Sequence, residues 1–410
     1  MKVQLVSCRT EFLQSAVEEL SGHLAAGQWV QLIPHPVGSV PLLPDLELPV
    51  GPGVVLASGG SSGQTKLCFH PQQHLVGSAE ATASWLEGIG VRPSATVVFN
   101  PLPLHHISGL MAWWRSRQWG ANHIWLSPEL MKQPDALLHC SERMAVGGEI
   151  SALLSLVPTQ LARLIDHAQG RFWLRQFSVI WIGGAPISAA LAYQAREAGL
   201  RLSPCYGATE TAAMVTAQSP QAFLASEGGS GSPLMDVELR LGHQGALQVR
   251  CPRLAVASWC RDRPDRLSML VDSQRWWTSG DLAALSGDGT TLCLNVLGRR
   301  DGAILSGGET VFPERLEDRL RSAARELGLP LQEVLIVGVS DSTWGQALVA
   351  LVRSTRPDQQ VQLLRAMPDL CSKWSAAERP KRWLACVDLE VNHAGKWERL
   401  KWSQRAAEAD

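Results

Sequence analysis

The sequence lacks the features that define several classes of protein. Its nine cysteines form no Cys-x-x-Cys pair, so we expect neither a disulfide framework nor a zinc cluster. Charges of the two signs nearly cancel, with 37 Lys and Arg against 38 Asp and Glu, which argues against nucleic acid or an anionic membrane as the main partner. No stretch approaches the ~18 apolar residues of a membrane span, and residues 1–20 lack the basic and apolar parts of a signal peptide. We therefore expect a cytoplasmic protein with no nucleic-acid partner and no membrane insertion, and we leave homo-oligomerisation open.

The composition and the periodicity of the chain predict an α/β fold. With 410 residues, of which 45% are hydrophobic and 18% charged, the chain is long enough for two to three globular domains. Between residues 75 and 250, short apolar runs alternate with segments of helical periodicity, which is typical of βαβ units around a mainly parallel sheet. The predicted strands are 54–56, 95–100, 122–127, 150–157 and 177–184, and the predicted helices are 10–25, 73–89, 158–169 and 188–199.

The later parts of the chain have a different texture. Residues 227–295 are rich in Gly and in short alternating runs, which predicts antiparallel sheet appended to the parallel one. Beyond them, a charged helix at 314–328 and two strands at 333–341 and 346–354 predict a small α+β domain over 302–410.

A segment rich in Gly and Ser, Ser58–Lys66, follows the first apolar strand. Its three Gly residues permit backbone conformations in which successive N–H groups face an anion, while three Ser hydroxyls and the terminal Lys add donors. The spacing is not that of a Walker A loop, because Gln64 and Thr65 separate the last Gly from Lys66. The composition indicates a phosphate-binding loop, although taken alone it also fits a flexible surface linker.

Four further short motifs follow in order. Residues 205–211 (CYGATET) combine a Tyr that can stack on a base, a Thr that can reach a phosphate and a Glu that suits Mg²⁺. Residues 276–282 (WWTSGDL) place a carboxylate where it can accept hydrogen bonds from both hydroxyls of a ribose. Residues 298–309 (GRRDGAILSGGE) and 392–399 (NHAGKWER) complete the set. Each motif alone fits an ordinary turn, so the information lies in their order and spacing.

Together the five motifs resemble those of the adenylate-forming superfamily, which includes acyl-CoA synthetases, luciferases and the adenylation domains of peptide synthetases. The resemblance runs from about residue 50 to 402. It departs from the family pattern at Thr65, where the phosphate loop has Pro, and at Ser279, which replaces the Thr of a TGD motif. The resemblance implies a large N-terminal domain of mainly parallel sheets layered with helices plus antiparallel sheet (1–298), a hinge (299–301) and a small mobile α+β C-terminal domain (302–410).

The resemblance also implies a two-step reaction and a role for each motif residue. A carboxylate attacks ATP, with Mg²⁺ bound, to give an acyl-adenylate and pyrophosphate, and the thiol of CoA then displaces AMP. The residues implied in catalysis are Lys396, which would bridge the substrate carboxylate and the α-phosphate, Thr209 on that phosphate, Glu210 on Mg²⁺ and His106 as a gate of the acyl and thiol channel. The residues implied in nucleotide binding are Ser58, Ser61, Ser62, Lys66, Gly184, Ala185, Tyr206, Asp281 and Arg299. Gly183 and Gly207 would line the acyl substrate, Gly307 and Gly308 would contact CoA, and Asp301 would be the hinge about which the small domain moves.

Two segments narrow the expected substrate. Residues 103–110 (PLHHISGL) and 157–161 (VPTQL) resemble segments of the 2-succinylbenzoate–CoA ligases, the branch of the superfamily that serves menaquinone and phylloquinone biosynthesis. The acid of that branch keeps a second, unreacted carboxylate, which a guanidinium can hold with two hydrogen bonds. Arg115 follows the first segment at a spacing also found in that branch, and Ser108 would assist it; the alternative for Arg115 is an exposed helix cation, like Arg117 nearby. The expected activity is therefore that of a 2-succinylbenzoate–CoA ligase, which forms succinylbenzoyl-CoA, AMP and pyrophosphate.

Three other functions compete with this prediction. Another aryl- or medium-chain acyl-CoA synthetase should not tolerate a buried Arg115 without a partner. An acyl-AMP ligase that loads a carrier protein is a second alternative, although no carrier domain is recognised within these 410 residues. A non-catalytic nucleotide-binding scaffold is the third, and the presence of Lys396, Glu210 and Asp281 argues against it. The segment before the phosphate loop has 57 residues, which is shorter than we expect for this family.

Overall fold

The computed structural model of the chain describes residues 3–37, 40–59, 65–143, 151–391 and 397–409. Two compact units make up the chain, and each is described by itself. The large unit comprises residues 1–187, 191–279 and 283–296, and the small unit comprises 188–190, 280–282 and 297–410. The small unit therefore contains the predicted small domain and hinge together with two short segments from earlier in the chain.

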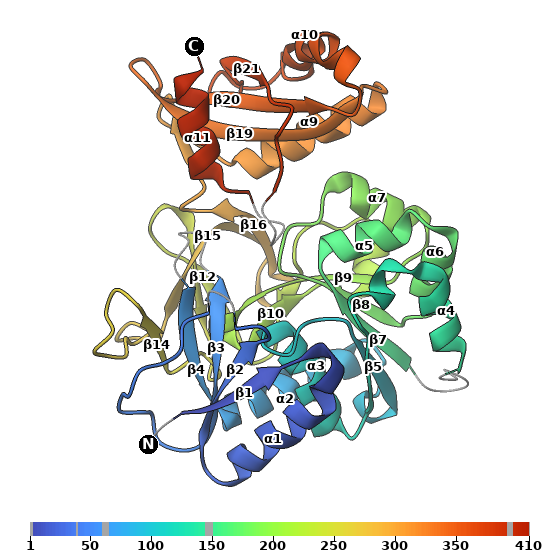
Figure 1. Cartoon of the computed structure of the whole chain (residues 1–410), viewed down its shortest axis with the longest axis vertical. Coiled ribbons are helices and arrows are strands. Elements are labelled where there is room, and N and C mark those ends of the chain that lie inside the picture. Colours follow the sequence, from blue (N-terminus) through green and yellow to red (C-terminus); the bar gives the residue numbers. More distant parts are fainter. Residues whose placement is uncertain (1–2, 38–39, 60–64, 144–150, 392–396, 410) are drawn as a thin grey trace. The chain divides into compact units, whose positions relative to one another are not determined.

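A seven-stranded sheet with the order β11-β10-β9-β8-β7-β5-β6 forms the centre of the large unit (Figure 1). Its strands are β5 (Thr96–Asn100), β6 (Asn122–Trp125), β7 (Ser151–Leu156), β8 (Val179–Ile182), β9 (Leu202–Ala208), β10 (Ala213–Ala217) and β11 (Ser232–Pro233). The pairs between β6 and β9 are parallel, and β10 and β11 join them in antiparallel fashion. The prediction of an α/β fold around a mainly parallel sheet is thus confirmed.

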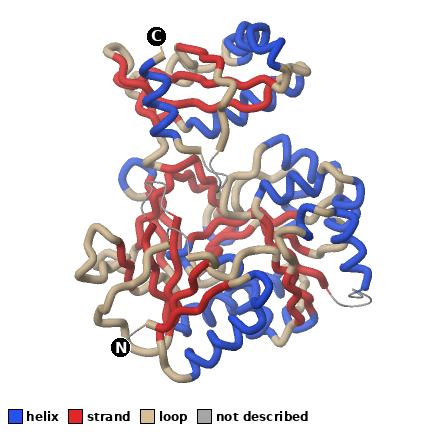
Figure 2. The backbone as a smooth tube through the Cα atoms, in the orientation of Figure 1, coloured by secondary structure: helices blue, strands red, loops and turns tan. Residues whose placement is uncertain are grey.

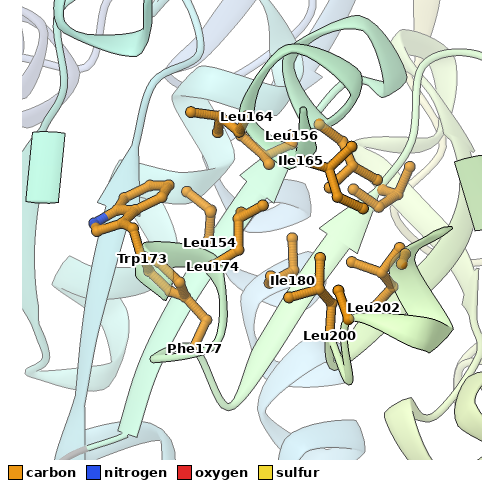
Figure 3. Packing of buried hydrophobic residues seen from close by; sticks show 14 of the residues in the cluster. Leu154, Leu156, Leu164, Ile165, Trp173, Leu174, Phe177, Ile180, Leu200 and Leu202 are labelled. Carbon is orange, nitrogen blue, oxygen red and sulfur yellow. The ribbon is translucent and has the colours of Figure 1, made fainter. Parts of the chain in front are cut away.

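Helices cover both faces of this sheet because its central strands are apolar on both sides. Leu154 and Ile180 point into a core that includes Trp173 and Phe177, whereas their neighbours Leu153 and Val179 point into a second core on the opposite face. Figure 3 shows the first of these cores, in which the rings of Trp173 and Phe177 meet edge to face at 4.6 Å between centroids. The helices of this part of the chain are α1 (Leu13–Ala25), α2 (Gln72–Gly88), α3 (Ile107–Trp119), α4 (Pro134–Arg143), α5 (Pro158–Ile165), α6 (Ala168–Leu174), α7 (Ala189–Glu197) and α8 (Pro220–Leu224).

One predicted helix, 158–169, is wrong as a single element, because the chain turns at His167 between α5 and α6. A straight continuation would place Phe172 on the same face as Ile165, seven residues earlier, and would turn Trp173 away from the core. In the structure Trp173 is fully buried and Phe172 is exposed. The break between the two helices therefore serves the burial of the larger aromatic side chain.

The first sheet of the large unit carries the segment predicted to bind phosphate. It has the order β1-β2-β3-β4-β14, and its members are β1 (Gln4–Cys8), β2 (Trp29–Pro34), β3 (Gly53–Gly59), β4 (Thr65–Pro71) and β14 (Ala257–Cys260). β3 and β4 are antiparallel, with Ser58 opposite Lys66. Ser58 and Lys66, the two ends of the Gly- and Ser-rich segment, therefore lie opposite each other on neighbouring strands.

A four-stranded sheet with the order β12-β13-β15-β16 lies in the region predicted to be antiparallel. Its strands are β12 (Glu238–Leu241), β13 (Ala246–Arg250), β15 (Trp277–Ser286) and β16 (Cys293–Arg299), and β12 and β13 are indeed antiparallel. Across the described ranges of the chain, no helix has both the length and the apolar character that crossing a membrane requires.

The small unit is a five-stranded sheet covered by helices on both faces, as Figure 2 shows. The strands are β17 (Ile304–Ser306), β18 (Glu309–Val311), β19 (Leu331–Asp341), β20 (Gly345–Ser354) and β21 (Arg382–Ala385), and the helices are α9 (Pro313–Glu326), α10 (Gln360–Leu370) and α11 (Arg399–Glu408). Alternate residues of β19 face opposite sides: Ile336 packs with the core under α9 and α10, and Leu335 packs with Trp402 of α11. This arrangement is the α+β architecture expected for 302–410.

Candidate active site

The carboxyl ends of the parallel strands gather the predicted site segments of the large unit at one edge of the seven-stranded sheet. β5 leads into the segment of His106, β8 leads into Gly183, and β9 carries Tyr206 and ends at Ala208. Ligands of open α/β sheets bind at this edge, because the loops that leave parallel strands converge there. Segments more than 100 residues apart in sequence therefore share one edge of the fold.

The segment of His106 is fixed to the end of β5 by a polar side chain. Asn100 donates a hydrogen bond from Nδ2 to the Gly109 carbonyl at 2.9 Å, and its Oδ1 accepts one from the Leu102 amide at 3.1 Å. A Cβ at Gly109 would overlap the Pro103 carbonyl, so only glycine permits this close approach. His106 is exposed and directly precedes α3. The hydrogen bonds of Asn100 and the close approach at Gly109 therefore fix the segment that carries it.

The two histidines of this segment differ in environment. Their rings lie 4.4 Å apart between centroids, and His105 is the more buried of the two. Burial, with a smaller effect of the charge of His106, lowers the pKa of His105 to about 4, so its ring is neutral at physiological pH.

Arg115 is buried in α3, and the alternative of an exposed helix cation is wrong for this residue. Its guanidinium carbon lies 5.6 Å from the ring centroid of Trp181, and its Nε and Nη2 have no hydrogen-bond partner among the described residues. Burial and the like charge of Arg253 lower the pKa of Arg115 to about 9, which still leaves the guanidinium charged at neutral pH. A buried charge without an anion is costly, and a carboxylate could accept hydrogen bonds from the two nitrogens that are unpartnered among the described residues.

The turn after β8 and this guanidinium both lie near Cys205. A Cβ at Gly183 would come within 3.1 Å of the Cys205 sulfur, and Gly184 has a left-handed backbone with φ of 80°. Burial raises the pKa of Cys205 to about 12, against the opposing effect of nearby Arg115, so the thiol stays protonated. Gly184 and Ala185 are exposed, which leaves their main chain open to a ligand.

The YGATE motif spans the end of β9 and a short 3₁₀ turn, Thr209–Thr211. A Cβ at Gly207 would overlap the Ala213 carbonyl, which explains the glycine of the motif. Thr209 and Glu210 follow in the turn and are half-buried. Among the described residues no three His, Cys, Asp and Glu side chains gather as metal ligands would. A single carboxylate such as Glu210 fits a Mg²⁺ that takes most of its oxygen ligands from phosphates and water.

Ser58 and Lys66, the ends of the predicted phosphate segment, and Glu210 all influence the pKa of the buried Cys68 thiol. Burial raises the pKa of Cys68, the carboxylate of Glu210 raises it further, and a hydrogen bond with Ser58 and the charge of Lys66 oppose both effects. The structure therefore brings Ser58, Lys66 and Glu210 into one neighbourhood. Ser61 and Ser62, also predicted to bind phosphate, lie outside the described residues.

In the small unit, Arg299 lies between two carboxylates. Its Nη1 is 3.4 Å from Asp281 Oδ1, and its Nε is 3.2 Å from Asp301 Oδ1. A Cβ at Gly280 would overlap the guanidinium, so this glycine lets Arg299 lie against the strand. The two residues predicted to hold a ribose, Asp281 and Arg299, are thus adjacent, and the predicted hinge residue Asp301 is in contact with them.

The two glycines predicted to contact CoA form the tight turn between β17 and β18. Gly307 and Gly308 have φ angles of 58° and 84°, a region that glycine adopts at little cost. A Cβ at Gly307 would come within 2.7 Å of the Trp344 ring, and Lys381 Nζ lies 3.5 Å from the centroid of that ring. The turn therefore exposes its main-chain groups, and the Trp344 ring and the Lys381 ammonium lie close to it.

The last motif is anchored by its arginine. Arg399 donates to both carboxylate oxygens of Glu317, at 2.8 and 3.1 Å, and to the Ile336 carbonyl at 2.7 Å, and its Nη2 is 3.1 Å from Glu314 Oε1. Glu317 is buried and also accepts a hydrogen bond from the Ile336 amide at 2.8 Å. Lys396, three residues earlier, lies outside the described residues. The start of α11 is thus held to α9 and β19 by a bidentate ion pair.

We expect Glu317→Ala to lower the free energy of unfolding by roughly 3–5 kcal/mol, because it leaves the Arg399 charge inside the fold without its main partner. Urea unfolding followed by tryptophan fluorescence measures the loss. The double variant Glu317→Leu/Arg399→Met should recover much of it, since both charges are removed together. The matched control is Glu378→Ala, which breaks the half-exposed pair with Arg319 and should cost about 1 kcal/mol or less. Equal losses in the single and the double variants would contradict a buried ion pair.

Several residues of the site carry no clear signal in the sequence. Trp181 belongs to an apolar run that predicted only a strand, and nothing in the run marks it as the neighbour of Arg115. Glu317 sits in a charged helix in which every carboxylate looks alike. Asn100 did leave a signal, since it is a polar residue at the end of an otherwise apolar strand and such residues often fix the following loop.

One family model matches part of the chain. Residues 50–249 match the model of the AMP-binding enzyme family. The matched range includes the predicted phosphate segment, the turn after β8 and the YGATE motif, and it ends before residues 280–282 and 297–410 of the small unit.

Curated relatives of the chain are named 2-succinylbenzoate–CoA ligase. One from Geobacillus sp. WCH70 is 29% identical over 264 residues, which cover 62% of this chain and 50% of the relative. One from Enterococcus faecalis is 24% identical over 365 residues, which cover 87% of this chain and 70% of the relative. The chain spans about half the length of the first of these relatives.

Solved structures share the fold along almost the whole chain. A structure of E. coli MenE with a bound analogue of OSB-AMS is 25% identical with a TM-score of 0.63, covering 99% of this chain and 82% of the other. o-Succinylbenzoate CoA synthetase of Bacillus subtilis, in complex with the acyl-adenylate intermediate OSB-AMP, is 20% identical with a TM-score of 0.72, covering 98% of this chain and 87% of the other. The second likeness concerns the fold alone.

Proposed function

We propose that this protein is an ATP-dependent acid–thiol ligase acting on 2-succinylbenzoate, because residues 50–249 match the model of the AMP-binding enzyme family. A carboxylate oxygen of the acid attacks the α-phosphorus of ATP, and the bond to pyrophosphate breaks. The sulfur of CoA then attacks the acyl carbon of the adenylate, and AMP leaves. The products are succinylbenzoyl-CoA, AMP and pyrophosphate, and the reaction takes place in the cytoplasm as a step of menaquinone or phylloquinone biosynthesis.

The observation that carries the choice of acid is the buried guanidinium of Arg115. Two of its nitrogens have no hydrogen-bond partner among the described residues, and it lies near Cys205, the sulfur of which a Cβ at Gly183 would approach. A simple fatty acid or benzoate has no group left for it after its carboxylate enters the reaction. 2-Succinylbenzoate has one, because its second carboxylate stays unreacted and can accept two hydrogen bonds. The names of the curated relatives support the same acid.

The remaining residues divide between the nucleotide, the acid and the thiol. Those proposed to bind ATP are Ser58, Ser61, Ser62, Lys66, Gly184, Ala185, Tyr206, Thr209, Asp281 and Arg299. Mg²⁺ at Glu210 would supply positive charge for the phosphates. Gly183, Gly207 and Ser108 border the acid, His106 gates the channel, and Gly307 and Gly308 receive the thiol. Lys396 neutralises the negative charge that develops at phosphorus in the first step. Between the two steps, movement about Asp301 withdraws Lys396 and brings the turn of Gly307 and Gly308 to the site.

Isotope exchange between pyrophosphate and ATP tests the proposed acid directly, because exchange requires reversible formation of the adenylate. We expect exchange with 2-succinylbenzoate to be about 100-fold faster, at equal subsaturating acid, than with benzoate, 4-chlorobenzoate or octanoate. The buried ion pair with Arg115 is available to the first acid only. Equal rates with benzoate and 2-succinylbenzoate would contradict the proposed role of Arg115 and the proposed substrate with it.

A further inference from the structure

The turn that carries Thr209 and Glu210 has an unusual backbone. Beyond Thr211, which follows these two residues, Ala212 and Ala213 have φ angles of 52° and 79°. Side chains with a Cβ rarely adopt this left-handed region, and two in succession are costly. A segment in such a conformation persists only where its surroundings hold it.

Hydrogen bonds from several elements hold this turn at each of its carbonyl groups. The six bonds are His70 Nε2 to Thr209 O at 2.7 Å, Ala255 N to Glu210 O at 2.8 Å, Arg253 Nη1 to Thr211 O at 2.7 Å, Ser78 Oγ to Ala212 O at 2.6 Å, Thr211 Oγ1 to Ala213 O at 2.6 Å and Arg253 Nη2 to Met214 O at 3.1 Å. All four donor side chains lie outside the YGATE motif of residues 206–210: His70, Ser78, Thr211 and Arg253. The turn is therefore shaped by residues that the motif does not contain.

His70 makes the bond that is closest to the proposed chemistry. It comes from β4, four residues after Lys66, and its ring is completely buried. Because a carbonyl only accepts, the bond to Thr209 requires the proton on Nε2, and Nδ1 is then an acceptor without a partner among the described residues. Burial, which outweighs the hydrogen bond to Thr209, lowers the pKa of His70 to about 3. The ring is thus neutral and in one tautomer at any working pH.

Arg253 completes the support from the opposite end of the turn. Its guanidinium is buried and pairs with Asp236, with 2.7 Å between Nε and Oδ2. With its charge compensated there, its two terminal nitrogens are available for the carbonyls of Thr211 and Met214. The turn is consequently fixed on both sides of Glu210, by His70 before it and by Arg253 after it.

We infer that His70 is a positioning residue for adenylate formation, which acts by holding the Thr209 carbonyl and thereby aiming the side chains of Thr209 and Glu210. The inference rests on the proposed function, which assigns the α-phosphate to Thr209 and Mg²⁺ to Glu210. His70 itself touches no substrate. Substitution of His70 should keep the side chains of Thr209 and Glu210 but shift their positions. Displacements of about 1 Å at a reacting group reduce rates by about 100-fold.

Two variants of similar length separate the hydrogen bond from the bulk of the side chain. Gln ends in an N–H at the same number of bonds from Cα as His Nε2, whereas Met fills a similar volume without a donor. For His70→Met we expect kcat/KM of acid-dependent pyrophosphate exchange to fall about 10-fold to 100-fold, with KM for Mg·ATP raised. For His70→Gln we expect a change of about 3-fold or less. Thioester formation from supplied acyl-adenylate should change little in either variant.

The control for general destabilisation is Gln31→Met. Gln31 is fully buried in β2 and makes two hydrogen bonds to backbone groups, Pro41 O at 2.7 Å and Leu43 N at 3.1 Å. Its loss should lower the melting temperature but leave pyrophosphate exchange unchanged. Equal activity of the Met and Gln variants at position 70, or no greater loss in His70→Met than in Gln31→Met, would overturn the inference. If His70→Met does not fold, His70→Asn replaces it, since its shorter amide does not reach Thr209, and it must lose activity where His70→Gln retains it.

Failure of the inference and failure of the proposed function have different signatures. If the wild-type protein exchanges pyrophosphate with 2-succinylbenzoate and the variants at position 70 are alike, only the inference fails. If the wild-type protein forms no adenylate with any acid, the proposed function fails. The inference is then judged on calorimetric affinity for Mg·ATP, which His70→Met must weaken relative to His70→Gln.

Discussion

Arg115→Ala should raise KM for 2-succinylbenzoate about 100-fold while KM for benzoate changes about 2-fold or less. The reason is that the buried guanidinium pairs only with the second carboxylate, which benzoate lacks. Steady-state release of AMP, with each acid varied at saturating ATP and CoA, measures both constants. The matched control is Arg117→Ala, which removes an exposed cation from the same helix and should leave both values unchanged.

The same substitution site allows an independent check on stability. Without a bound acid, a buried guanidinium costs free energy when two of its nitrogens find no partner in the described part of the chain, so Arg115→Met should raise the free energy of unfolding by on the order of 1 kcal/mol. The variant would thus be more stable and less specific at once. A proportional rise of KM for both acids, together with a less stable Arg115→Met, would mean that Arg115 serves the core and not the substrate.

Lys396→Ala should reduce adenylate formation by about 100-fold to 1000-fold, because it removes the positive charge that is proposed to neutralise the negative charge developing at the α-phosphorus. The second half-reaction, transfer from supplied succinylbenzoyl-adenylate to CoA, should keep its rate within about 3-fold, since Lys396 is proposed to be withdrawn from the site in that step. Rapid-quench measurement of each half-reaction separates the two effects.

Lys401→Ala supplies the control for this variant. Lys401 is an exposed cation of α11, five residues further along the chain, and its loss should affect neither half-reaction. Equal loss of both half-reactions in Lys396→Ala would contradict the assigned role, because it would indicate one conformation serving both steps.

Most of the fold could be predicted because its signals are local. Apolar runs of β-branched and aliphatic residues at 95–100, 150–157 and 177–184 are strands β5, β7 and β8, buried on both faces as parallel strands usually are. The break between α5 and α6 could not be predicted in the same way. It depends on the choice between Phe172 and Trp173 for a place in the core, and only the packing of the whole sheet decides that choice.

The residues of the candidate site also differ in how far the sequence can predict them. Motif residues such as Gly207 and Gly307 carry their reason locally, in a close backbone approach or a left-handed turn, so their spacing is informative. The burial of Arg115 beside Trp181 depends on strands and helices that meet only in the folded chain. The same is true of His70 and Thr209, which are 139 residues apart in sequence and are joined by one hydrogen bond. Sequence therefore indicates the reacting groups better than the groups that hold them.

Mass spectrometry of the products tests the central claim most directly. The protein is incubated with Mg·ATP, CoA and 2-succinylbenzoate, and the reaction is sampled for adenylate, thioester and AMP. We predict succinylbenzoyl-CoA and AMP in equal amounts, with the free adenylate present only when CoA is left out. Adenylate that accumulates in the presence of CoA, without thioester, would contradict CoA as the acceptor and point to a carrier protein. Absence of both adenylate and thioester would contradict the ligase itself and favour a nucleotide-binding scaffold.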